Sequence, residues 1–166
     1  MAIDALNTLG EREFVEAVGW VFEHSPWVAE RAWPMRPFAD VGELRDAMVQ
    51  QVELASPEEQ LALLRAHPDL GGRVRLSDAS ANEQIGAGLD QLTREEFDAF
   101  TRLNESYGQK FGFPFLYAVK GSTKYDILRT LEQRIRSTRE DEYREALRQV
   151  YRIAEFRLND YVSQER

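Results

Sequence analysis

The sequence feature that most constrains the fold is a repeated signature of helix starts. A Ser, Thr or Asp is followed three residues later by Glu, and this spacing lets the two side chains satisfy backbone N–H groups that the first helical turn leaves unpaired. The signature occurs at Thr8/Glu11, Asp40/Glu43, Ser56/Glu59, Ser80/Glu83 and Thr93/Glu96. This density of starts predicts an all-α fold, a single-domain helical bundle of roughly seven to nine helices over residues 1–166.

Composition narrows the class of protein. The 166 residues carry a formal charge of -8, which argues against a nucleic-acid binder, because such proteins neutralise phosphates with basic side chains. With no cysteine and only two histidines, the chain is not expected to hold disulfides, a cysteine nucleophile or a histidine-rich zinc site. No apolar run approaches the roughly 18 residues of a membrane span, and the N-terminus lacks a secretory signal. We therefore expect a cytoplasmic protein that does not enter a membrane.

The predicted C-terminal helix, roughly residues 139–162, carries a charge where apolar residues are expected. One helix face is formed by Tyr143, Leu147, Val150, Ala154, Arg157 and Tyr161, which advance by alternating steps of four and three. A guanidinium keeps its proton, so a buried Arg157 needs an anion or several acceptors around it. Arg157 could form a structural ion pair with a core carboxylate, could extend to the edge of the apolar stripe, or could bind a ligand.

Two further positions allow a structural and a functional interpretation. His67 precedes Pro68, which ends the helix that begins at Pro57, because a residue before proline is pushed out of the helical region. His67 could therefore cap that helix, or it could supply acid–base chemistry. The stretch from Ser80 to Gln84 could be a capping box, or it could present free N–H groups, a carboxylate and an amide to a polar ligand.

The segment 113–119 is the one stretch that could be a strand, because it is short, apolar and bounded by glycine. A single strand would have no partner for its backbone, so we expect a buried extended segment or an irregular turn. Nearby, residues 120–124 have the wrong order for a phosphate-binding loop. Nucleotide binding is therefore not predicted.

Taken together, these motifs and their order resemble the family of decarboxylases that act on 2-oxo-4-hydroxy-4-carboxy-5-ureidoimidazoline (OHCU). The matching motifs are His67-Pro68-Asp69-Leu70, Ser80-x-x-Glu83-Gln84-x-x-Ala87-Gly88-Leu89, Leu103-Asn104-x-x-Tyr107, Lys110-Phe111-Gly112-Phe113-Pro114-Phe115, Lys120-Gly121, Arg152-Ile153-Ala154 and Arg157-Leu158. The resemblance covers nearly the whole chain. Leu116 stands where this family often has Ile or Val, which is a mild change.

The resemblance implies an all-α enzyme without cofactor or metal, usually a homodimer, that converts OHCU to (S)-allantoin in urate catabolism. It implies that His67 is the catalytic acid–base and that Glu83 and Arg157 are catalytic residues of the same pocket. The substrate-binding residues that it implies are Pro68, Ser80, Gln84, Phe115, Leu116 and Val119. The expected partner is a small-molecule substrate, with no nucleic acid and no membrane.

The chemistry suits these residue types. Loss of carbon dioxide leaves an electron pair that the ring C=N bond of OHCU can accept, so no external electron sink is required. The protein must orient the substrate, stabilise charge and place a proton on one face of the ene-diol-like intermediate. Two alternatives stay open, a ureide hydrolase or allantoin racemase, and a non-enzymatic helical module that binds a partner peptide.

Overall fold

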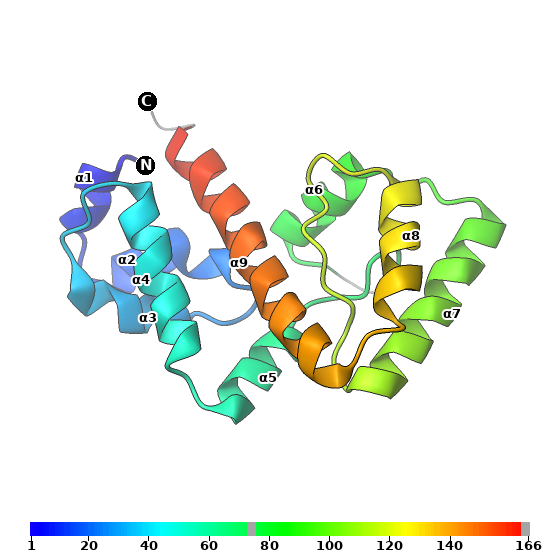
Figure 1. The fold of residues 1–166 in the computed structure, drawn as a ribbon. Helices are drawn as coiled ribbons and strands as arrows, with labels where there is room; N and C mark the ends of the chain where they lie inside the picture. Colours follow the sequence, from blue (N-terminus) through cyan, green and yellow to red (C-terminus); the bar gives the residue numbers. More distant parts are fainter. Residues whose placement is uncertain (73–75, 164–166) are drawn as a thin grey trace. The chain divides into compact units, whose positions relative to one another are not determined.

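The computed structural model describes residues 1–72 and 76–163, and every regular element in these ranges is helical (Figure 1). The α-helices are α1 (Ile3–Asn7), α2 (Glu11–Val18), α3 (Trp27–Ala32), α4 (Val41–Glu53), α5 (Pro57–Arg65), α6 (Asp78–Gly86), α7 (Arg94–Phe111), α8 (Lys124–Arg134) and α9 (Arg139–Ser163), with 3-10 turns η1 (Gly19–Val21) and η2 (Trp33–Met35). The predicted all-α class is confirmed, and the C-terminal helix has nearly the predicted bounds. None of these helices combines the length and the apolar character needed to cross a bilayer.

The chain forms two compact units. The first comprises Met1–Ala66 and the described residues from Tyr151 onward, and the second comprises the described part of His67–Val150. Each unit has its own apolar core. That residues 1–166 act as one domain stays a prediction.

Side-chain caps account for most of the helix N-termini. Ser56 with Glu59 and Thr93 with Glu96 form complete capping boxes, and the Asp40 side chain accepts from the backbone N–H of Glu43. A further box, Thr123 with Asp126, starts α8 and was not predicted. Aspartate closes this box in place of the glutamate that defines the sequence signature.

Two predicted starts are wrong. Helix α6 begins one turn before the predicted box, because Ser77 is its cap and accepts from the backbone N–H of Ser80 at 3.1 Å. Ser80 and Glu83 are therefore helical residues and do not form a capping box. Thr8 caps nothing at α2, whose N-cap is Gly10, because the Thr8 hydroxyl donates to the Ala5 carbonyl at the end of α1.

In the first unit, α2, α3 and α4 pack against one another. Phe14 and Val18 of α2 are buried, together with Val21 in η1 and Phe22 directly after it. From α4, Leu44 and Met48 are completely buried as well. This core therefore follows directly from the helical spacing of apolar residues.

In the second unit, α7 and α8 pack side by side (Figure 1). On α7, Phe100, Tyr107 and Phe111 are inaccessible to solvent or nearly so, whereas Phe97 and Leu103 are half-buried. The segment 113–119 is extended without being a strand, as predicted, and most of its side chains are buried. Gly112 ends α7 in the left-handed conformation at φ 84°, which glycine adopts without strain.

Candidate functional site

The turn that carries His67 lies directly after α5. The C-cap of α5 is Ala66, so His67 is the first residue beyond the helix, and its exposed fraction is 8%. Pro68 beside it is half-buried, and the turn continues through Leu70 to Gly71, both buried. His67 is thus a largely buried imidazole in an irregular turn at the end of α5.

Helix α6 is joined to this turn by a side chain. The Gln84 Oε1 atom accepts from the backbone N–H of Gly71 at 3.0 Å, and Gln84 is buried. Its Nε2 atom is also buried and has no hydrogen-bond partner among the described residues. Ser80 is buried and Glu83 half-buried on the same helix. The structure thus joins the helix that carries Ser80, Glu83 and Gln84 to the turn that carries His67.

The extended segment is held by a buried polar network of the second unit. The Arg134 Nη1 atom donates to the Leu116 carbonyl at 2.5 Å, and Arg134 Nε donates to Glu142 Oε1 at 2.8 Å. The Tyr107 hydroxyl donates to the same Glu142 oxygen at 2.6 Å. Burial raises the pKa of Tyr107, and the bond to Glu142 raises it further. Tyr107 therefore acts as a hydrogen-bond donor and not as an acid.

A second polar contact fixes the same segment two residues further on. The backbone N–H of Ala118 donates to Gln149 Oε1 at 2.9 Å. The predicted substrate-binding residues Phe115, Leu116 and Val119 are all buried around it. This segment consequently has side-chain anchors where a strand would have a neighbouring strand.

Arg157 has the buried carboxylate partner that one of the three interpretations required. Its exposed fraction is 4% and that of Glu23 is 2%. The Arg157 Nη1 atom lies 3.2 Å from Glu23 Oε1 and 3.3 Å from the carbonyl oxygens of Trp20 and Val21. All these groups belong to the first unit. Arg157 is thus held in a buried ion pair with Glu23.

Sequence reasoning missed Glu23, Arg134, Glu142 and Gln149. Glu142 and Gln149 are buried at positions seven residues apart on α9, which is two helical turns. An acidic residue and an amide that recur on one helix face would have been a usable signal. Glu23 directly follows the buried pair Val21 and Phe22 but shows no such periodicity.

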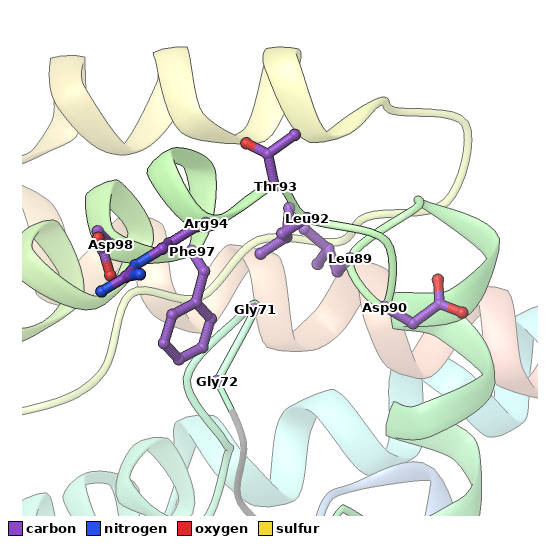
Figure 2. A pocket seen from close by; sticks show the side chains of 9 residues that line it. All are labelled: Gly71, Gly72, Leu89, Asp90, Leu92, Thr93, Arg94, Phe97 and Asp98. Carbon is purple, nitrogen blue, oxygen red and sulfur yellow. The ribbon is translucent and has the colours of Figure 1, made fainter.

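A cavity of about 650 Å³ lies beside the Gly71 turn in the second unit (Figure 2). It is lined by Gly71, Gly72, Leu89, Asp90, Leu92, Thr93, Arg94, Phe97 and Asp98. The Phe97 ring extends toward the glycine backbone, and the Arg94 and Asp98 side chains lie together at one side. None of the predicted site residues lines this cavity. Within the described ranges, no group of three His, Asp or Glu side chains is placed to hold a metal ion.

These observations define a class: an all-helical protein in which a buried His-Pro turn is tied to a helix carrying Ser80, Glu83 and Gln84. The sequence profile of the OHCU decarboxylase family matches residues 7–159, and the chain belongs to that family.

Known relatives agree with this assignment. The chain is 49% identical over 165 residues to the 2-oxo-4-hydroxy-4-carboxy-5-ureidoimidazoline decarboxylase of Haloferax volcanii, covering 99% of this chain and 98% of that protein. It is 44% identical to part of a uric acid degradation bifunctional protein, PucL, of Bacillus subtilis, covering 98% of this chain and 33% of that protein. The solved structure of an (S)-allantoin synthase has a similar fold, with a TM-score of 0.81 and 31% identity, over 98% of this chain and 54% of that chain.

Proposed function

We propose that this protein is a carboxy-lyase that decarboxylates OHCU to (S)-allantoin in urate degradation. The observation that carries the proposal is the Gln84 contact with Gly71, because it unites the His67 turn and the Ser80 to Gln84 helix in one local structure. Membership of the OHCU decarboxylase family supports the reaction type. The near full-length relative from Haloferax volcanii, which bears that activity in its name, supports the substrate.

The proposed reaction needs little from the protein beyond orientation and proton placement. The bond from the ring carbon to the carboxylate breaks, carbon dioxide leaves, and the electron pair moves toward the neighbouring C=N bond, whose nitrogen takes a proton. The hydroxyl on the decarboxylated carbon then becomes a carbonyl and gives up its proton. The neighbouring ring carbon takes a proton on one face, which sets the S configuration.

In this proposal His67 hydrogen-bonds the substrate hydroxyl and manages the proton, and Glu83 positions the hydroxyl or the imidazole. Gln84 has a buried Nε2 donor without a partner among the described residues, and that donor suits a ring or ureido oxygen. Arg157 is proposed to hold oxygens of the substrate in addition to its ion pair with Glu23. Pro68, Ser80, Phe115, Leu116 and Val119 are the proposed substrate-binding residues.

The remaining features of the proposal concern the assembly. We propose that residues 1–166 act as one domain, that the enzyme works without cofactor or metal, and that it forms a cytoplasmic homodimer with no nucleic-acid or membrane partner. The substrate's own C=N bond supports a reaction without a cofactor, because it accepts the electron pair. Light scattering coupled to gel filtration measures the mass and tests the dimer directly.

The test of the function uses the two histidines as a matched pair. OHCU is generated in situ from urate, and allantoin formation is followed by circular dichroism with wild type, His67→Asn and His24→Asn. His24 is exposed and lies outside every matching motif. We expect His67→Asn to leave only slow, racemic product and His24→Asn to match wild type. Retention of more than about a tenth of kcat/KM in His67→Asn, a loss under ~1.4 kcal/mol, rejects His67 as the acid–base.

A further inference from the structure

Two buried amide side chains hold one peptide group in the turn that follows His67. Asn104 Nδ2 donates to the Leu70 carbonyl at 2.8 Å, and Gln84 Oε1 accepts from the Gly71 N–H at 3.0 Å. The Leu70 carbonyl and the Gly71 N–H belong to the same peptide bond. Side chains from α7 and α6 therefore satisfy both polar groups of that one peptide. We propose that Asn104 is a positioning residue for His67, an inference that rests on the proposed function.

The peptide between Leu70 and Gly71 needs such a restraint because glycine permits either orientation of the peptide plane. Gly71 adopts φ 74°, in the left-handed region that other residues rarely enter. A Cβ atom on Gly71 would come within 3.1 Å of Leu92 and 3.3 Å of Phe100, so a larger residue would not fit without movement. Glycine itself therefore places little restriction on the orientation of this peptide, and the two amide side chains hold it in one orientation.

The selected orientation bears on His67 because the intervening chain is short and partly rigid. Only Pro68, Asp69 and Leu70 separate His67 from Gly71, and the proline ring fixes one of the backbone angles between them. Leu70 and His67 are both buried. A reversal of the Leu70–Gly71 peptide would break both amide contacts and would shift the backbone that carries the imidazole.

The hydrogen bonding of Asn104 favours a positioning role over a purely stabilising one. Its Oδ1 atom is buried and has no hydrogen-bond partner among the described residues. A buried acceptor left unpaired opposes folding, so the gain from the Leu70 contact is partly cancelled. Replacement by leucine, which has a similar size, removes the unpaired acceptor together with the donor. Asn104→Leu also leaves the Leu70 carbonyl without its donor, which lowers stability. The variant is therefore expected to fold and to melt roughly 2–12 °C below wild type.

The test compares Asn104→Leu with a matched variant of the first unit. Asn7 holds a loop in the same way, with Nδ2 donating to the Phe38 carbonyl and Oδ1 accepting from the Phe38 N–H, both at 2.8 Å. Turnover of OHCU is measured per folded molecule, and the imidazole signals of His67 and His24 are followed by NMR. Assignment is simple because the chain has two histidines.

We expect Asn104→Leu to lower kcat at least about tenfold with a smaller change in KM, and to move or split the His67 signal while the His24 signal stays in place. Asn7→Leu is expected to lower the melting temperature and to leave kcat and the His67 signal unchanged. The smaller variant Asn104→Ser checks that the effect does not come from the leucine side chain.

Three results would overturn the inference. One is wild-type kcat with an unmoved His67 signal in Asn104→Leu, and another is loss of the folded state in both Asn104 variants, which would make Asn104 a core residue only. The third is a fall in kcat equally large in Asn7→Leu. If His67→Asn is inactive while Asn104→Leu behaves as wild type, the positioning role fails and the proposed function stands. An active His67→Asn enzyme instead rejects His67 as the acid–base, whereas failure of the wild-type protein to turn over OHCU rejects the proposed function.

Discussion

The buried ion pair between Arg157 and Glu23 gives the sharpest test of what Arg157 does. Arg157→Met leaves a carboxylate that is 2% exposed without its cation. Breaking a buried pair from one side costs about 3–5 kcal/mol, because the remaining charge has lost its opposite charge and is still shielded from water. For a chain of this length each kcal/mol lowers the melting temperature by roughly 2–4 °C. We therefore expect a fall of about 6–20 °C.

The double variant Arg157→Met/Glu23→Leu separates stability from activity. Replacing both members of a buried pair by apolar residues is often nearly neutral, so most of the lost stability should return. The residual cost of about 1–3 kcal/mol reflects the carbonyl groups of Trp20 and Val21, which also lose their donor. Stability is measured by urea and thermal unfolding, and activity by formation of optically active allantoin per folded molecule.

If Arg157 holds the substrate, the double variant is stable and inactive. Recovery of activity along with stability would show that Arg157 is only a structural residue and would refute its proposed catalytic role. A loss under about 1 kcal/mol in Arg157→Met would refute the energetic argument itself, since a buried carboxylate that loses its cation is expected to cost several times more.

Three further predictions concern other residues. Ser77→Ala should lower the free energy of unfolding by about 1 kcal/mol in urea titrations, because Ser77 caps α6; an unchanged free energy of unfolding would contradict the observed cap. Tyr107→Phe should cost about 1.5–3 kcal/mol in the same assay, since it removes a buried bond to the Glu142 carboxylate; an unchanged midpoint would contradict this. The hydrogen bond from Arg31 is the largest contribution that lowers the pKa of Glu59 to about 2. The ionised Glu59 carboxylate therefore stabilises the fold above a pH of about 4.5, and this stabilisation is lost as the pH falls toward about 2. Glu59→Gln should make the melting temperature depend less on pH between about 2 and 4.5. An unaltered pH dependence would contradict the stabilising role of the Arg31–Glu59 pair.

Much of the fold was predictable because helix caps and apolar periodicity are local signals. Ser56, Thr93 and Asp40 cap helices as their spacing to glutamate predicts. The same signal failed at Ser80, because Ser77 lies one turn earlier and offers an equally good oxygen to the backbone. A local pattern cannot decide between two adjacent caps when the helix can start at either.

The candidate site was predictable only in part, because its polar partners come from distant parts of the chain. The anomaly at Arg157 was visible as a charge in an apolar stripe, but its partner Glu23 lies 134 residues away in sequence. Likewise, nothing near Leu116 indicates that Arg134 accompanies it. Local spacing finds residues that need a partner, whereas the tertiary structure supplies the identity of that partner.

The central claim is enantioselective decarboxylation, and one time course tests it most directly. OHCU is generated in situ from urate, and carbon dioxide release and circular dichroism are recorded together at several concentrations of the wild-type protein. The account predicts that both rates rise in proportion to protein, that they coincide, and that the product is (S)-allantoin. Carbon dioxide release at the uncatalysed rate with racemic product would contradict it. So would an optical signal that arises when racemic allantoin alone is added to the protein.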